Sequence, residues 1–238
     1  MSKRICLWAT PRNISTALMY SFAQRPDTLV IDEPLYGFYL KHSGVLHPGK
    51  EEVLKNMETD GQKVIKNIIL KTYNQPVIFL KQMTHHLLDL DLAFLEQTIN
   101  VLLIRNPYEM ILSYTKVISH PTMETLGLKA QYELFNYLQS VNALHAIIDS
   151  KYLLMNPKEV LEKLCDKIGI PFFEEMLRWK AGARPEDGVW AQYWYDSVHN
   201  STGYKPYMKV TEHIPEYLSG LYKACSPYYD QLTKHAIR

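Results

Sequence analysis

The sequence has few cysteines, little net charge and no long apolar run, and each absence excludes a class of protein. Its 238 residues include three widely spaced cysteines, so neither a disulfide framework nor a zinc site is expected. The formal net charge of +1 gives no overall field for nucleic acid or a membrane surface. No window suits a membrane span, and the apolar run after Lys3 and Arg4 is too short for a signal peptide. We therefore expect a cytoplasmic protein with reduced thiols and no nucleic-acid or membrane partner.

Glycine is absent from the turn that follows the first predicted strand, and the GxxxxGK[ST] pattern of ATP-binding loops does not occur there. The turn 10–14 is instead followed by a helix that opens on Ser15 and Thr16. Backbone N–H groups and the positive end of a helix dipole converge at such a junction, which suits a phosphate or sulfate. A guanidinium can hold two phosphate oxygens at once. The residues expected to hold the anion are Arg12, Asn13, Ile14, Ser15 and Thr16.

Apolar strands alternate with amphipathic helices as far as about residue 170. Strands are expected at 4–9, 28–31, 76–81, 100–104 and 152–155. Helices are expected at 15–24, 51–73 with a break at Gly61, 87–97, 107 to beyond 113, 130–150 and 157–167, with a helical turn at 36–41 and a mobile loop at 41–50. This alternation predicts an α/β fold, in which one parallel sheet of the P-loop type has helices on both faces. From about Pro171 the pattern fades into an aromatic-rich segment that is expected to wrap back over the sheet, so that residues 1–238 form one domain.

Ligands of open parallel sheets bind at the carboxyl ends of the strands. That rule places four segments on one edge: residues 10–16, 32–33, 81–86 and 105–106. Arg105 follows a very apolar predicted strand. Hydrolytic P-loop enzymes often have an aspartate at such a strand end, where it holds magnesium. Ser113 lies about two helical turns further on and can share a phosphate with Arg105.

The segment that ends in Asp32 and Glu33 also resembles a magnesium-binding strand end. It keeps a P-loop kinase or ATPase open as an alternative, although the missing Gly-Lys-[Ser/Thr] sequence argues against it.

Taken together, these segments resemble the sulfotransferases that use 3′-phosphoadenosine 5′-phosphosulfate (PAPS). The turn 10–16 is similar to their 5′-phosphosulfate loop, with Arg12 in place of the usual lysine and Ile14 in place of glycine. The run 102–113 is similar to their 3′-phosphate site. Two further stretches match in order, at 154–172 and 201–204.

The resemblance implies that Arg105 and Ser113 hold the 3′-phosphate of PAPS, and that Thr202 and Gly203 belong to a late cofactor loop. It implies PAP as the product and no metal. Sulfuryl would pass to a hydroxyl or amine of a small-molecule acceptor that enters beside the loop 41–50. Arg12 and Lys81 would neutralise charge on the departing phosphate.

The resemblance leaves two kinds of catalytic base open. Glu33 matches the glutamate of carbohydrate-modifying members, whereas His85 or His86 would match the histidine of the aryl and steroid branch. A third possibility is a module that binds the nucleotide without catalysis.

Overall fold

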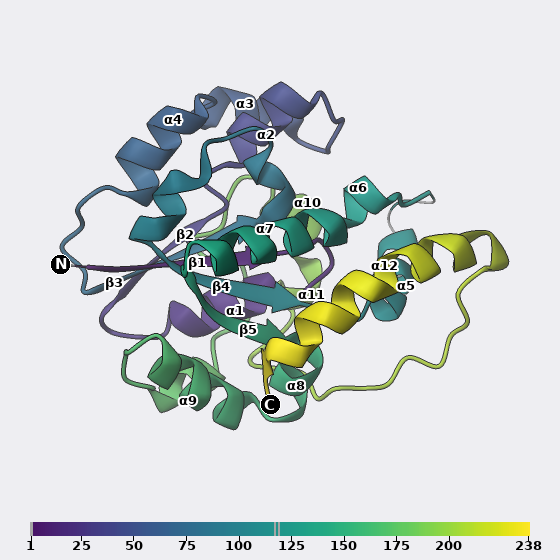
Figure 1. Cartoon of the computed structure of the whole chain (residues 1–238). Helices are drawn as coiled ribbons and strands as arrows, with labels where there is room; N and C mark the ends of the chain where they lie inside the picture. The colour runs from purple at the N-terminus through teal and green to yellow at the C-terminus, as the bar shows by residue number, and fades with distance from the viewer. Residues whose placement is uncertain (1, 117, 119) are drawn as a thin grey trace.

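The computed structural model describes residues 2–116, 118 and 120–238, and it contains a six-stranded parallel sheet (Figure 1). The strand order is β2-β3-β1-β4-β5-β6, with β1 in the interior of the sheet. The strands are β1 (Lys3–Ala9), β2 (Thr28–Asp32), β3 (Val77–Met83), β4 (Ile99–Ile104), β5 (Leu144–Asp149) and β6 (Ala236–Ile237). Every pair is parallel, which confirms the predicted α/β fold class.

Both faces of the sheet are buried, because apolar side chains of each strand alternate between them. In β1, Leu7 joins one core cluster and Trp8 joins the other. The first face is covered by α1 (Ser15–Phe22), α8 (Ser150–Met155), α9 (Pro157–Lys167) and the 3₁₀ turn η4 (Glu174–Leu177). The second face is covered by the π-helical turn η1 (Ile65–Ile69), the 3₁₀ helix η3 (Leu92–Gln97), α7 (Leu128–Ser140) and the end of α12 (Ser219–Leu232). Figure 1 shows α7 and α12 side by side.

The fifth strand lies earlier than predicted. The helix expected at 130–150 ends at Ser140, and the strand expected at 152–155 is part of helix α8. Asn142 adopts a left-handed backbone conformation with φ of 54°, which asparagine tolerates better than most residues, and so turns the chain into β5. The carboxylate of Asp149 then accepts the backbone N–H of Lys151 and caps α8.

Several helix boundaries also differ from the prediction. The helical stretch expected at 51–73 consists of α3 (Lys50–Asn56), α4 (Gly61–Val64) and η1, and it is interrupted before Gly61 because Asp60 caps α4. The region 87–97 holds 3₁₀ turns, η2 (Thr84–Leu87) and η3, rather than an α-helix. Helix α2 (Tyr36–Ser43) extends into the segment predicted as a loop.

The carboxyl ends of β1 to β4 all lead into short turns on one edge of the sheet, as predicted. The turn after β4 enters α5 (Pro107–Thr115), with Pro107 in the first helical turn, and α6 (Met123–Leu126) follows. After residue 171 the chain is irregular and contains only the short elements η4, α10 (Ala191–Trp194), α11 (Asp196–His199) and η5 (Glu216–Leu218) before α12. The 14-residue helix α12, a short 3₁₀ turn and β6 restore regular structure at the end, which the prediction of a fading pattern missed.

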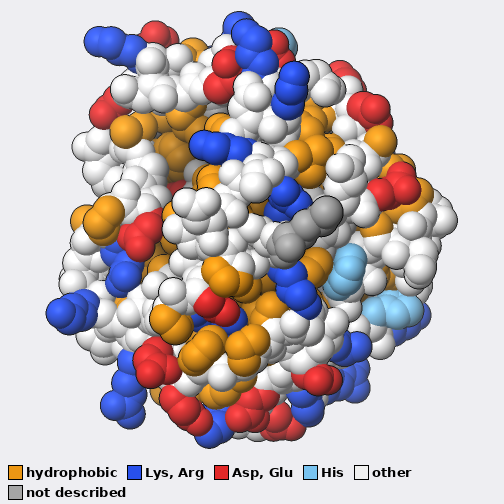
Figure 2. All heavy atoms as spheres, turned by 90° about the vertical axis from the view of Figure 1, so that its left-hand side faces the viewer, with side chains coloured by type: hydrophobic (Ala, Val, Ile, Leu, Met, Phe, Trp, Pro, Cys, Tyr) orange, Lys and Arg blue, Asp and Glu red, His pale blue; other side chains and the backbone are white. Residues whose placement is uncertain are grey.

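Figure 2 views the side of the molecule at the left of Figure 1, and acidic and basic side chains are intermixed on it. This agrees with the small net charge. Within residues 2–116, 118 and 120–238, none of the helices combines the length and apolar character that a membrane crossing needs.

Candidate functional site

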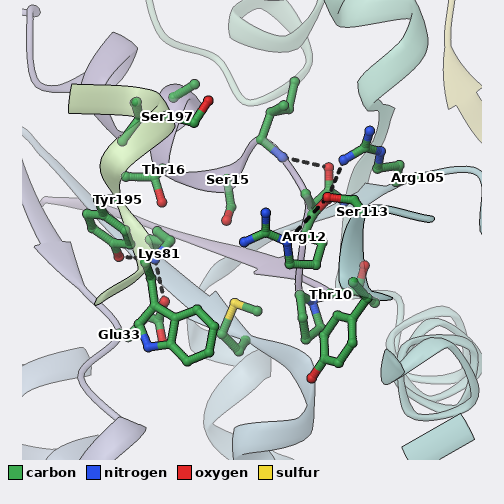
Figure 3. Close-up of a pocket in the computed structure, with 18 of the residues that line it drawn as sticks. Thr10, Arg12, Ser15, Thr16, Glu33, Lys81, Arg105, Ser113, Tyr195 and Ser197 are labelled. Atoms are coloured by element: carbon green, nitrogen blue, oxygen red, sulfur yellow. Dashed lines mark hydrogen bonds and ion pairs between the residues drawn. The ribbon is translucent and has the colours of Figure 1, made fainter. Parts of the chain in front are cut away.

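A pocket of about 480 Å³ opens where the strands end, and Figure 3 draws 18 of the residues that line it. Its lining comes mainly from the turn after β1 and the start of α1, the ends of β2 and β3, Arg105 after β4, the C-terminal end of α5, and the segments 36–47 and 190–205. It includes nearly every residue that the sequence singled out: Arg12, Asn13, Ile14, Ser15, Thr16, Glu33, Lys81, His85, His86, Arg105, Ser113 and Gly203.

The turn after β1 is fixed to the sheet by Asn13. Its side-chain amide donates to the carbonyl of Leu103 at 2.9 Å, and its oxygen accepts the backbone N–H of Ile14. Ile14 precedes α1 and offers no side-chain cap, so it supplies no acceptor to the N–H groups of the first helical turn. The same turn contains Ser15 and Thr16, which line the pocket. The N-terminal end of α1 therefore opens into the pocket, at the place where the sequence predicts an anion site.

Two arginines meet beside this helix. Arg12 Nε donates to Ser113 Oγ at 3.3 Å, and Arg105 donates from Nη1 to the backbone oxygen of Arg12. Burial and the nearby charge of Arg105 both lower the pKa of Arg12. Arg105 is balanced only in part, by Glu109 at 3.4 Å, whose other oxygen accepts a hydrogen bond from Tyr207. We call Arg12, Arg105 and Ser113 the cationic cluster.

A second group of charges, here called the carboxylate–lysine cluster, consists of Asp32, Glu33, Lys81 and Tyr195. The ammonium of Lys81 donates to Asp32 Oδ1 at 2.9 Å, to Tyr195 Oη at 2.6 Å and to Glu33 Oε1. These bonds use all three N–H groups of the ammonium. Lys81 is almost fully buried, and the neighbouring carboxylates raise its pKa against the opposing effect of burial. Figure 3 shows Arg12 between this cluster and the Arg105–Ser113 pair.

Glu33 has an unusual backbone and a perturbed carboxyl group. Its φ of 39° is left-handed, a conformation that non-glycine residues rarely adopt and that is often found at functional sites. Burial raises the pKa of Glu33, and the charge of Asp32 adds to this, while Lys81 opposes it. A carboxyl group with a raised pKa in a pocket takes up a proton more readily than an ordinary carboxylate.

The two histidines at the end of β3 differ from the carboxylates in being held neutral. His86 stacks on Tyr36 and Tyr39, with ring centroids 5.1 and 4.6 Å apart, and burial lowers its pKa well below the usual range. Burial also lowers the pKa of His85 to about 3. Neither buried Nδ1 atom has a hydrogen-bond partner among the described residues, and His86 Nδ1 lies 3.9 Å from Glu33 Oε2.

The late loop contributes only one of its two predicted residues. Gly203 lines the pocket, whereas Thr202 is not among the lining residues and its carbonyl accepts the backbone N–H of Trp179. A Cβ at position 203 would lie 2.9 Å from the backbone oxygen of Leu177, so the close packing of these two segments of the chain requires glycine there.

The sequence did not connect Tyr195 to the buried charges, and it did not identify which aromatic rings lie around the histidines. Trp190 lies edge-on to Tyr36, and Trp194 lies edge-on to His47, whose Nδ1 is 2.9 Å from the Tyr36 hydroxyl. The predicted aromatic wrap was the available signal, but it did not show which rings reach the pocket. In the part of the chain that the structure describes, no group of three or more metal-ligating side chains gathers at one point.

Comparison with known proteins places this site in context. A family model described as "Sulfotransferase domain" matches residues 3–236. Two curated proteins of Arabidopsis thaliana, named "Branched-chain-amino-acid aminotransferase-like protein 2" and "protein 1", are each 40% identical to this chain over 96% of its length. The chain spans only 41% of each of these relatives.

Solved structures show the same fold at low sequence identity. The sulfotransferase domain of the curacin biosynthetic pathway has a TM-score of 0.54 at 15% identity and covers 100% of this chain and 99% of that one. The sulfotransferase domain of the Synechococcus PCC 7002 olefin synthase has a TM-score of 0.57 at 17% identity over 94% and 95% of the two chains. A sulfotransferase from Alicyclobacillus acidocaldarius has a TM-score of 0.57 at 9% identity over 100% and 98%. With the family match over nearly all of its length, this chain belongs to the sulfotransferase domain family.

Proposed function

We propose that this protein is a sulfotransferase that moves a sulfuryl group from PAPS to a hydroxyl or amine of a small-molecule acceptor. The observation that carries the proposal is the cationic cluster, in which two guanidinium groups and a serine converge beside the N-terminus of α1. Two neighbouring guanidinium groups repel each other, and a bound phosphate would relieve that repulsion.

The residues present fit a nucleotide with several phosphate groups. The pocket volume of about 480 Å³ is within the usual range for small-molecule sites, about 300 to 1,000 Å³. The buried hydroxyl of Thr10 has no hydrogen-bond partner within the part of the chain that the structure describes, and Thr10 lines the same pocket. Arg12, Ser15 and Thr16 would hold the phosphosulfate, and Arg105 with Ser113 the 3′-phosphate. PAPS supplies an activated sulfuryl group whose transfer leaves the negative charge on PAP.

Glu33 is the base that the site favours. An acceptor hydroxyl must lose its proton as the new sulfur–oxygen bond forms. Glu33 combines a raised pKa with one oxygen, Oε2, that receives no hydrogen bond from the described residues. His85 has a pKa of about 3, so its protonated form is too unstable for it to hold a proton near neutral pH.

Magnesium-dependent phosphoryl transfer is less well supported, because Asp32 is fully engaged. Lys81 binds one carboxylate oxygen, while the other accepts from the Tyr195 hydroxyl and the backbone N–H of Gly188. A metal ion at Asp32 would have to displace these donors.

A nucleotide-binding module without turnover is the second candidate. All three N–H groups of Lys81 are used inside its cluster, so contact with a bridging oxygen would require one of those bonds to break. The curated relatives also carry aminotransferase-like names rather than sulfotransferase names.

Two broader inferences accompany the proposal. We infer one domain over residues 1–238, because strands from both ends of the chain share one sheet. A cytoplasmic location is consistent with Cys6, Cys165 and Cys225, which are buried and unpaired.

Calorimetry with PAP, and with ATP plus magnesium, tests the donor site. We expect PAP to bind without magnesium and ATP to bind more weakly. Release of PAP from PAPS is then followed with a panel of phenols, alcohols and amines. Acceptor-dependent release supports the enzyme, PAP binding with no release for any panel member supports the module, and failure to bind PAP rejects both.

A further inference from the structure

We propose that Tyr195 is a positioning residue that holds Asp32 as a fully hydrogen-bonded carboxylate, and so leaves Glu33 as the carboxylate that takes up the acceptor's proton. This inference rests on the proposed function, since it assigns the proton to one member of a buried pair in that site. The sequence alone did not connect Tyr195 to the chemistry of this site.

The charges of Asp32, Glu33 and Lys81 do not balance. Asp32 and Glu33 are adjacent and buried, with 7% and 8% of their surfaces exposed, and Lys81 is the only cation that pairs with them in the described structure. Two carboxylates and one ammonium carry a net charge of −1. A proton that enters the cluster therefore relieves the repulsion, and the surroundings decide which carboxylate receives it.

Hydrogen bonds to the two carboxylates are unequal. Asp32 accepts from three donors: Lys81 at 2.9 Å, the Tyr195 hydroxyl at 2.7 Å and the backbone N–H of Gly188 at 3.2 Å. Glu33 accepts only from Lys81 among the described residues, through Oε1. Since hydrogen bonds to a carboxylate favour its ionised form, Glu33, which receives fewer of them, is the better site for a proton.

The phenol of Tyr195 is suited to this task. Burial and the charge of Asp32 raise its pKa well above the usual value, so it remains a neutral donor. Its oxygen also accepts from Lys81 and from Trp190 Nε1 at 3.2 Å, which orients the O–H towards Asp32. Figure 3 shows Tyr195 beside Lys81 and Glu33.

Other titratable groups around Glu33 do not take over this role. From η2 it faces His86. Burial, His85 and the charge of Lys81 lower the pKa of His86 well below its usual range. From α2 it faces Tyr36, whose pKa is raised by burial and by Glu33 itself. Lys81 on β3, with its raised pKa, stays charged. Asp32 and Tyr195 complete the surroundings.

Carbon-13 NMR of labelled aspartate and glutamate carboxyl groups tests the assignment without an acceptor. Signals are assigned from Asp32→Asn and Glu33→Gln. In the wild type we expect the titration to appear at Glu33 Cδ, above the ordinary glutamate range. In Tyr195→Phe, part of the titration should appear at Asp32 and the midpoint should rise by about one pH unit. Asp32→Asn should lower the titration midpoint of Glu33, because the repulsion from Asp32 is lost and the charge of Lys81 remains.

Tyr193→Phe is the matched control, since Tyr193 lies on α10 and is 46% exposed; it should leave both signals unchanged. Identical Glu33 and Asp32 titrations in wild type and Tyr195→Phe, with PAP still bound, would overturn the role of Tyr195 alone. Titration at Asp32 rather than Glu33 in the wild type would also overturn it. Failure of the wild type to bind PAP would instead reject the proposed function.

Discussion

Arg12 Nε donates a hydrogen bond to Ser113 Oγ at 3.3 Å and so joins the turn after β1 to helix α5. The sequence assigned these residues to separate ends of one nucleotide. The structure brings them into contact, with Arg105 also bonded to the backbone of Arg12, so the two proposed phosphate sites adjoin. Loss of either arginine should therefore weaken binding of the same ligand.

Arg105→Ala should weaken PAP binding about a hundredfold. Two charge-assisted hydrogen bonds to a phosphate contribute about 3 kcal/mol together, and each 1.4 kcal/mol is a factor of ten. Arg12→Ala should have an effect of similar size. Isothermal titration calorimetry measures both, with Lys129→Ala as a control that removes one exposed positive charge on α7. A dissociation constant in either arginine variant equal to that of the control would contradict the proposed nucleotide site.

Glu33→Gln should lower kcat by at least about a hundredfold while PAP affinity stays unchanged, because loss of a general base typically costs 10² to 10⁴ in rate. His85→Gln should cost less than about tenfold, since His85 has a pKa of about 3. Steady-state kinetics with an acceptor found in the panel compares the two variants. The reverse order of effects would make His85 the base.

The pH dependence of stability should also differ between Glu33→Gln and the wild type. The pKa of Glu33 is raised in the folded protein above its ordinary value of 4.5, so the native state binds the proton more tightly than the unfolded state. The wild type therefore loses stability as the pH rises from about 4.5 through the folded pKa, and Glu33→Gln lacks this loss.

Thermal melts at pH 5 and pH 8 measure this difference. Lys81 and His86 are present in both proteins, so their own contributions to the pH dependence cancel in the comparison. The melting temperature of Glu33→Gln relative to the wild type should be higher at pH 8 than at pH 5. An equal difference at the two pH values would show that the carboxyl group is not perturbed.

The strand ends were predictable from sequence because each combines a buried apolar run with a change to polar residues. Thr10, Glu33, Lys81 and Arg105 line the pocket for this reason. The fifth strand was not predictable in the same way. No glycine or proline separates it from α7, and only Asn142 with the β-branched pair Ile147 and Ile148 signalled the change.

Contacts between segments far apart in the chain could not be predicted from the sequence. The bond from Tyr195 to Asp32 spans 163 residues, and that from Arg12 to Ser113 spans 101. Periodicity and turn residues report on neighbours along the chain, whereas the partner of a tyrosine in an irregular segment depends on how that segment packs. The predicted aromatic wrap therefore gave the place of Tyr195 but not its partner.

Tyr20→Phe should destabilise the protein by about 1–3 kcal/mol, because it removes a donor from a buried carboxylate. The Tyr20 hydroxyl, on α1, lies 2.7 Å from both oxygens of Asp187 in the irregular segment that covers the pocket. Asp187 would keep the backbone N–H of Arg184 and the ring of His199 as partners. Urea unfolding measures the change, and Tyr193→Phe should stay within about 0.5 kcal/mol of the wild type, as is usual for exposed positions. Equal stability of the two variants would show that this bond does not hold the segment in place.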